Sequence, residues 1–124
     1  DKRIDKLLAE FGLSDWQNAL IESYSHGMKQ RLATCSALVH KPHILIIDEP
    51  TVGIDIKTKA YLHELIINLA DNGTSIILIS SDMPEMISLA DRIVVMKDFK
   101  VNGIVENDRD YDVVSSKIME FIHS

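Results

Sequence analysis

The apolar residues of this 124-residue chain follow two spacings, one typical of helices and one typical of strands. Ile4, Leu7, Leu8 and Phe11 recur at helical spacing, which predicts an amphipathic helix that ends near Gly12. Short aliphatic runs bounded by Pro, Gly or polar residues predict buried strands instead. The further predicted elements are, in chain order, a short helix capped by Ser14 or Asp15, a helix over 28–39, a strand over 44–47, a helix capped by Asp55 and ended at Asn72, a strand over 75–79, a helix over 84–90, a strand over 93–96, an edge strand over 100–106 and a last helix through 114–122.

The order of these elements predicts an α/β fold. Strands and helices alternate in units about thirty residues long, which favours parallel strands joined by crossover helices. The chain shows no internal repeat or linker, so residues 1–124 are assigned to one partial domain. Residues 1–40 are expected to be its helical part and residues 41–124 its α/β core. The first helix has no obvious capping residue before it, which favours a chain that begins inside a larger unit.

Composition narrows the classes of partner. The net charge of −6 argues against a nucleic-acid-binding surface and against an anchor on anionic membranes. The aliphatic runs are far too short to span a bilayer. The single cysteine, Cys35, excludes an internal disulfide and suits a reducing compartment, and its place on an apolar helical face favours packing over chemistry. The five histidines show no metal-ligand spacing.

Residues 44–55, ILIIDEPTVGID, carry the clearest chemical signal. An aliphatic run ends in two adjacent carboxylates, Asp48 and Glu49, and the turn that follows closes on Asp55. Nucleotide hydrolases of the α/β class use acids at the C-terminal end of a buried strand to hold magnesium and activate water. The competing interpretation is a strand that simply ends on two solvated acids, and the surrounding segments make it the weaker one.

A second candidate site precedes the helix over 28–39. Ser25, His26 and Gly27 lie where free backbone N–H groups and the helix dipole attract anions. The Ser25 hydroxyl can donate to a phosphate oxygen, and Gly27 allows the backbone to approach closely. Taken alone, this pattern is more often only a helix cap.

Four segments together resemble the second half of the ATPase domain of ABC transporters. They are YSHGMKQR, ILIIDEPTVGID, ILISSDMPE and ADRIVVM, and they stand in the family's order and spacing, so that the resemblance extends over essentially the whole chain. The resemblance implies a P-loop NTPase-like parallel sheet flanked by helices, with part of the helical subdomain at the N-terminus. It identifies residues 24–28 as the signature, 44–48 as the Walker B strand, 52–55 as the D-loop and 80–82 as the switch segment.

The resemblance also implies a role for each site residue, with ATP and Mg²⁺ as cofactors. Asp48 would hold Mg²⁺, and Glu49 would act as general base on the attacking water unless it only satisfies a local backbone donor. The signature would contact ATP held by a partner cassette in a head-to-tail dimer, through Ser25, His26, Gly27 and Met28. The D-loop residues Gly53 and Asp55 would couple the two sites, and Asp82 would stand at the catalytic switch position.

The chain departs from the family pattern in three places. No G-x-x-x-x-G-K-[ST] occurs, so the phosphate-binding loop and its central strand are expected to be missing, and the chain alone should not bind ATP tightly or hydrolyse it. Two strand edges would then lack a partner, which favours self-association or domain swapping. His26 replaces the first signature glycine, where a solvated turn residue that tolerates positive φ is favoured over a phosphate ligand. Asp82 replaces the switch histidine, and its repulsion of phosphate predicts slow or differently arranged hydrolysis.

The leading functional hypothesis is an ATPase that drives solute transport. Asp82 and the turn Gly53-Ile54-Asp55 with Lys59 resemble the second cassette of fused sugar-importer ATPases, so sugar import is the leading subclass. The resemblance implies a second cassette and a transmembrane permease as partners, no nucleic acid, and a cytoplasmic place on the inner face of the cell membrane. The alternative is a non-transport ABC ATPase, such as a DNA-repair or chromosome-organising head or a regulatory dimerisation module. Zinc cysteines, coiled-coil insertions and a basic surface are not seen, which favours transport.

Overall fold

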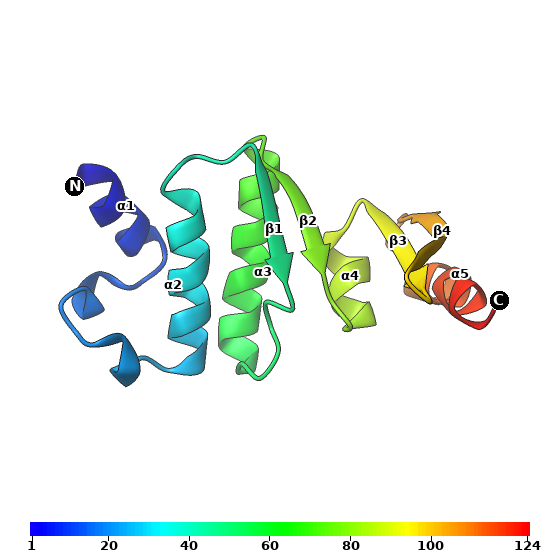
Figure 1. Ribbon diagram of the computed structural model, residues 1–124, viewed down its shortest axis with the longest axis horizontal. Helices are drawn as coiled ribbons and strands as arrows, with labels where there is room; N and C mark the ends of the chain where they lie inside the picture. The colour runs from blue at the N-terminus through cyan, green and yellow to red at the C-terminus, as the bar shows by residue number, and fades with distance from the viewer. The chain divides into compact units, whose positions relative to one another are not determined.

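In a computed structural model, which describes residues 1–124, the chain divides into two compact units, residues 1–79 and residues 80–124. The first unit contains α1 (Lys2–Glu10), α2 (His26–Leu38), β1 (Ile44–Asp48), α3 (Ile56–Asp71) and β2 (Ser75–Ile79). The second unit contains α4 (Met83–Leu89), β3 (Arg92–Lys97), β4 (Lys100–Glu106) and α5 (Tyr111–His123) (Figure 1). The predicted α/β class is confirmed.

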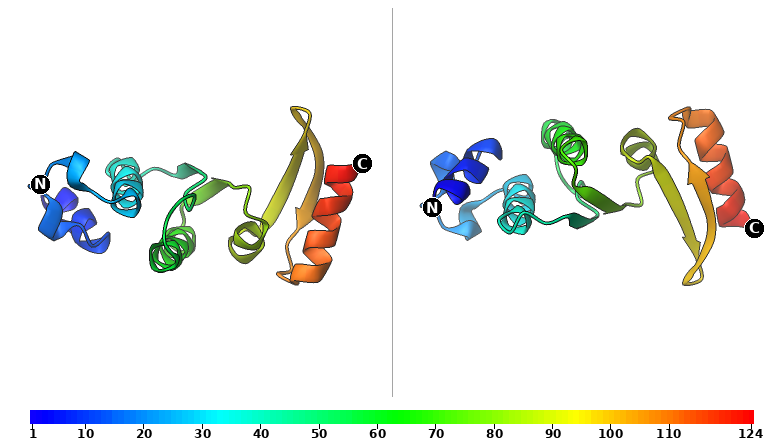
Figure 2. Two further views of the ribbon diagram at one scale, coloured as in Figure 1. Left: turned by 90° about the horizontal axis from the view of Figure 1, so that it is seen from below. Right: turned by 90° about the horizontal axis from the view of Figure 1, so that it is seen from above.

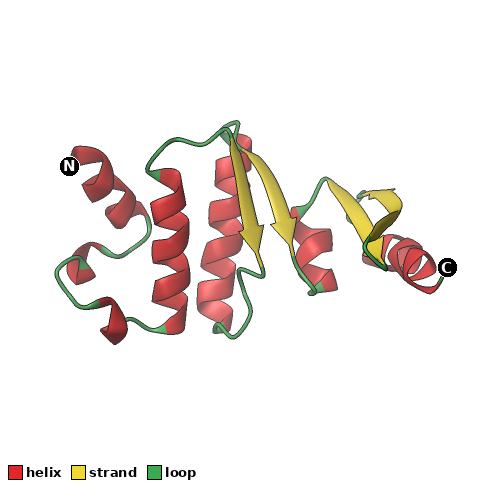
Figure 3. Cartoon of the chain, viewed as in Figure 1, coloured by secondary structure: helices red, strands yellow, loops and turns green.

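Strands β1 and β2 form a parallel pair joined by the crossover helix α3. The register runs from Ile44 opposite Ser75 to Asp48 opposite Ile79, and Figure 3 shows both strand arrows pointing the same way. Both views in Figure 2 place α3 on one side of the pair. The buried residues of this unit's main cluster are Leu7, Phe11, Leu13, Tyr24, Cys35, Leu38 and Leu45. Partly buried residues of α2, α3 and both strands pack against it.

The other face of the β1–β2 pair is bare, which corrects the prediction that both strands are buried. Side chains alternate between the two faces of a strand, and only one face packs on the cluster. On the opposite face, Ile44, Ile46, Ile77 and Ile79 are each at least half exposed. We refer to these four residues as the bare isoleucine face. An unbroken aliphatic run predicts burial of both faces of a strand, whereas within this chain only one face of each strand is covered.

Three other expectations for the first unit are resolved by local structure. Asp1 caps α1, since its carboxylate accepts a hydrogen bond from the Arg3 N–H at 2.9 Å, so the expectation of an uncapped start is wrong. The segment expected to be one short helix forms two 3₁₀ turns instead, Ser14–Trp16 and Ile21–Ser23. Cys35 is buried in the core, and that burial raises the pKa of its thiol, which confirms packing as its role.

The second unit is built on an antiparallel hairpin of β3 and β4, a pairing that the strand predictions for 93–96 and 100–106 did not specify. Strand β3 pairs with β4 along its whole length, from Arg92 opposite Glu106 to Lys97 opposite Lys100. The two-residue connection, Asp98 and Phe99, has positive φ at both positions, as the tight hairpin turns that match strand twist require. Helix α5 lies along this ribbon (Figure 2) and buries Val114 and Ile118. Ile122, near the C-terminal end of the same helix, is 39% exposed.

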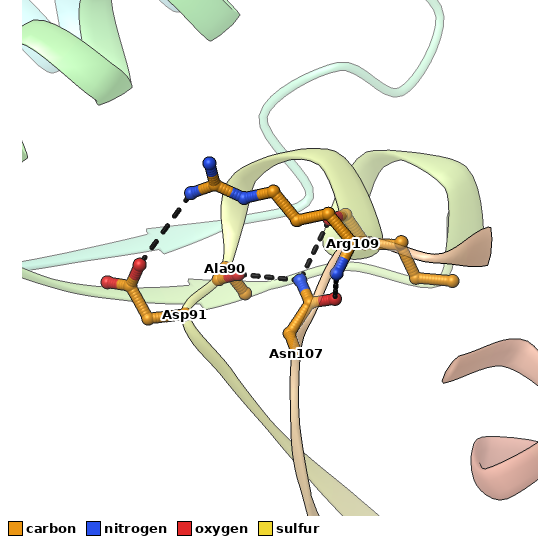
Figure 4. Close-up of polar contacts among 5 residues, drawn as sticks. Ala90, Asp91, Asn107 and Arg109 are labelled. Atoms are coloured by element: carbon orange, nitrogen blue, oxygen red, sulfur yellow. Dashed lines mark hydrogen bonds and ion pairs between the residues drawn. The ribbon is translucent and has the colours of Figure 1, made fainter. Parts of the chain in front are cut away.

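In the second unit, Asn107 joins the end of β4 to the end of α4. Asn107 lies just after β4, and its amide donates to the carbonyls at the end of α4, Ile87 at 2.8 Å and Ala90 at 2.6 Å (Figure 4). The same figure shows Arg109 reaching Asp91 at 3.7 Å, an exposed ion pair that adds little stability. None of the helices in either unit is both long enough and apolar enough to cross a membrane.

Candidate functional site

The C-terminal end of β1 presents the two acids that the sequence singled out. Asp48 is the last residue of the strand and is exposed, and Glu49 follows it and is partly buried. The Glu49 N–H donates to the Ile79 carbonyl at 2.8 Å, which continues the β1–β2 pairing by one step. Glu49 has a φ of +44°, in the left-handed region that residues with a Cβ seldom adopt. Such a conformation costs about 1–3 kcal/mol and occurs at functional sites as well as in turns such as Asp98-Phe99.

These acids fit a magnesium ion that is bound together with a nucleotide. No group of three or more His, Cys, Asp or Glu side chains is placed to hold a metal in this chain. Mg²⁺, however, commonly uses one or two carboxylates and completes its octahedron with water and substrate phosphates. Asp48 offers an exposed carboxylate of this kind at the end of β1.

Asp55 begins α3 and is held there by Thr58. Its carboxylate accepts the Thr58 N–H at 2.9 Å and the Thr58 hydroxyl at 2.8 Å, which confirms the predicted helix cap. Both hydrogen bonds favour the ionised form, and the Thr58 backbone bond is the largest reason that the pKa of Asp55 lies below its ordinary value of 3.8.

This cap predicts a pH dependence. The pKa of Asp55 is lower in the folded chain than in the unfolded chain. Its ionised form therefore stabilises the fold at pH values above the ordinary pKa of the side chain. The contribution is lost as the pH falls through the lower folded pKa. Asp55→Asn keeps a capping oxygen but cannot titrate. We expect the variant's free energy of unfolding to fall less steeply with acid below pH about 4, measured by urea unfolding. Equal slopes for the two proteins would contradict this role for Asp55.

The signature segment occupies the start of α2. The helix begins at His26, two residues earlier than predicted, and the Ser25 hydroxyl accepts the Met28 N–H at 3.2 Å as its cap. His26 therefore has helical backbone, and the tolerance of positive φ expected of it is not needed. Gly27 is buried against α3, since a Cβ added there would lie 2.8 Å from Thr58 Cγ2. The absence of a side chain at Gly27 thus allows the Thr58 side chain to pack closely against α2.

The signature and the D-loop meet in the first unit. The His26 imidazole lies 3.0 Å from the Val52 carbonyl through its Nε2 atom. Gly53 has a φ of +71°, and a Cβ added to it would contact the His26 ring at 3.8 Å. The structure therefore brings His26 and Gly27 against the segment 52–58, to which Gly53 and Asp55 belong. We call this junction the α2–α3 corner.

Asp82 lies in the second unit, where it caps a helix. Its carboxylate accepts the Glu85 N–H at 2.9 Å and begins α4. Glu85 is 1% exposed, and its carboxylate accepts the Ser80 hydroxyl at 2.6 Å. The same hydroxyl accepts the Asp82 N–H at 3.0 Å. Asp82 thus caps α4 at the switch position. Its role in catalysis stays a prediction.

Sequence reasoning missed the residues that support these positions. Asp82 and Glu85 stand three apart before an apolar helix, which is the spacing of a capping box and was readable. Asp55 and Thr58 have the same spacing. The His26 contact with Val52 had no such signal, because it joins residues that are 26 positions apart in the chain.

Comparison with known sequences points to one family. The sequence model of the ABC transporter family matches residues 1–52. A putative ribose/galactose/methyl galactoside import ATP-binding protein 2 of Rhizobium meliloti is 42% identical over 100 residues, which is 81% of this chain and 19% of that protein. The galactose/methyl galactoside import ATP-binding protein MglA of Clostridium perfringens is 45% identical over 89 residues, 72% of this chain and 17% of its own length. The chain thus spans less than a fifth of the length of these curated relatives.

Solved structures with the same fold are ATP-binding cassettes. The ADP conformation of MJ1267, an ATP-binding cassette of an ABC transporter, matches with a TM-score of 0.84 over 97% of this chain and 48% of its own. Its sequence identity is 19%, so this match supports the fold alone. The cbiO1 protein of Clostridium perfringens, part of the ABC transporter complex cbiONQ, matches with a TM-score of 0.78 and 28% identity over 95% of this chain and 46% of its own. A dimeric bacterial ABC transporter cassette, MJ0796, matches with a TM-score of 0.76 and 27% identity over 85% of this chain and 46% of its own.

Proposed function

This chain belongs to the family of ABC transporter ATPases, and on that premise we propose that the whole protein binds and hydrolyses ATP to drive a solute across a membrane. The observation that carries the proposal is the strand end at Asp48 and Glu49, followed directly by the α2–α3 corner. The relatives named for ribose, galactose and methyl galactoside import support a sugar as the solute class, and they favour transport over a non-transport ATPase.

Each site residue is proposed to act through a group that the structure describes. Asp48 holds Mg²⁺ through its exposed carboxylate. When bound, that ion neutralises charge on the phosphate groups. Glu49 accepts a proton from the attacking water, and its left-handed backbone turns the chain from β1 into the D-loop. Asp82 is proposed to act at the switch position, with its carboxylate already engaged at the start of α4.

The proposed partners are a second cassette and a permease. The free N–H groups at the start of α2 and the residues Ser25, His26, Gly27 and Met28 would face ATP on the second cassette. The dimeric form of MJ0796 supports a two-cassette arrangement. Through its permease the protein would lie on the cytoplasmic face of the membrane.

Transport by the full-length protein tests this function. The protein, reconstituted with its permease in vesicles, is expected to take up a pentose or hexose only when MgATP is present on the ATPase side. Uptake that is equal with and without ATP would overturn the proposal. ATP hydrolysis without any uptake would instead support the non-transport alternative.

The 124-residue chain studied alone is expected to self-associate. The bare isoleucine face is an exposed apolar surface, and the outer edge of β2 has unpaired backbone N–H and C=O groups. Both kinds of surface promote association between chains. Light scattering at increasing concentration should show a mass above that of one chain. The double variant Ile46→Lys/Ile77→Lys, which places charge on that face, should remain monomeric over the same range. A monomeric parent chain at high concentration would contradict the expectation.

A further inference from the structure

The D-loop is tied to the signature by one side chain. His26 Nε2 lies 3.0 Å from the Val52 carbonyl oxygen, and the two residues are 26 positions apart. A carbonyl oxygen can only accept a hydrogen bond, so Nε2 must carry a proton and donate. Both the neutral tautomer protonated at Nε2 and the imidazolium ion satisfy this requirement.

The turn that receives this hydrogen bond has long backbone hydrogen bonds of its own. Between Glu49 and Asp55, the Val52 N–H donates to the Glu49 carbonyl at 3.4 Å and the Ile54 N–H donates to the Thr51 carbonyl at 3.4 Å. These distances exceed the usual 2.7–3.2 Å range for such bonds, so each holds the turn weakly. The shorter His26 contact therefore matters for the position of the turn.

Two further contacts place the same turn against α2. The His26 ring lies beside Gly53, at the distance where an added Cβ would be in ordinary contact. Gly27 admits the Thr58 side chain, and Thr58 in turn donates twice to Asp55. The C-terminal end of the D-loop is thus held by Thr58, and His26 contacts its first two residues, Val52 and Gly53.

We propose that His26 is a positioning residue that fixes the D-loop against the signature helix, and that it thereby orients the segment leading out of Glu49. The inference rests on the proposed function and adds to it a contact within one chain. Val52 lies three residues after Glu49 and directly before Gly53. A shift of the Val52 backbone would therefore move the backbone of Glu49 on one side and of Gly53 on the other. The family resemblance would place glycine at position 26, and glycine has no side-chain donor. The hydrogen bond to the Val52 carbonyl therefore depends on the histidine of this chain.

The test compares two substitutions at this position in the full-length protein. His26→Ala removes the donor, and His26→Gln replaces it with an amide N–H of similar reach. We expect His26→Ala to lower kcat for ATP hydrolysis by roughly twofold to tenfold, the usual effect of one hydrogen bond, with KM for ATP little changed. His26→Gln should recover most of that loss. His40→Ala, which alters an exposed histidine near the end of α2, is the matched control and should leave kcat unchanged.

Hydrogen–deuterium exchange gives a readout that does not depend on activity. Amides of residues 51–58 should exchange faster in His26→Ala than in the parent protein, and His26→Gln should restore slow exchange. Unchanged exchange in His26→Ala, or equal defects in the alanine and glutamine variants, would overturn the inference. A raised KM with unchanged kcat would also overturn it, because His26 would then contact the nucleotide itself. If the parent protein hydrolyses no ATP, the proposed function fails, and the exchange measurement still decides the role of His26.

Discussion

Replacing Glu49 by glutamine in the full-length protein is expected to lower kcat for ATP hydrolysis by about 10²–10⁴-fold, the usual contribution of a general base. Glutamine matches glutamate in size but cannot accept a proton from water at this position. The backbone of residue 49 remains left-handed in both proteins, so the turn is expected to keep its shape. Steady-state phosphate release measures the effect, and ATP affinity measured by equilibrium binding should change little.

A glutamate elsewhere on the same unit provides the control. Glu64 lies exposed on α3, and Glu64→Gln makes the identical chemical change away from the strand end. Its kcat should equal that of the parent protein. If Glu49→Gln also hydrolyses ATP at the parent rate, Glu49 is not the base, and its acid serves only the local backbone.

Gly27→Ala is expected to destabilise the chain by about 2 kcal/mol, because the added methyl group overlaps Thr58. The new Cβ would meet Thr58 Cγ2 at 2.8 Å and Oγ1 at 3.2 Å. Thr58 is β-branched, and its hydroxyl is bonded to Asp55, so it cannot rotate away cheaply. Overpacking typically costs about 1–3 kcal/mol, whereas the better helix propensity of alanine returns at most about 1 kcal/mol. Urea unfolding at low protein concentration measures the net loss.

A second substitution separates this overlap from other causes. Thr58→Ser removes Cγ2 and keeps the hydroxyl that bonds Asp55, so the double variant Gly27→Ala/Thr58→Ser should recover most of the lost stability. Thr58→Ser alone should have a small effect. No recovery in the double variant would show that the cost arises elsewhere, and a stable Gly27→Ala protein would contradict the packing described at the α2–α3 corner.

Local signals predicted most of the elements. The helix α3 with its cap at Asp55, the strand β2 and the buried faces of Val114 and Ile118 all follow from periodicity and capping chemistry. These features depend on residues within one turn or one strand of each other, and neighbouring side chains decide them.

Features that depend on distant partners were predicted less well. The runs at 44–47 and 75–79 indicated burial, but an aliphatic run cannot specify how many of its faces are covered. The hairpin of β3 and β4 was missed because its turn, Asp98-Phe99, lacks the Asn-Gly or Asp-Gly pair that usually marks such a connection. A capping serine followed by a glycine led to a helix start at Met28, whereas Ser25 caps a helix that begins at His26.

The candidate site shows the same division. Sequence alone selected Asp48, Glu49 and Asp55, since carboxylates that follow a strand or precede a helix are visible in the order of residues. It could not show that Thr58 fills the space beside Gly27, or that Glu85 is buried beneath the switch segment. Those relations arise only when helices pack.

The left-handed backbone at Glu49 opposes the stability of the fold to the base role proposed for the Glu49 carboxylate. Glycine would adopt a φ of +44° without strain, and asparagine with less strain than glutamate, so either residue at 49 is expected to raise the melting temperature. Neither can take a proton from water. Selection for heat resistance alone would therefore disfavour the acid, and a sequence designed only to satisfy this backbone would lack the proposed base.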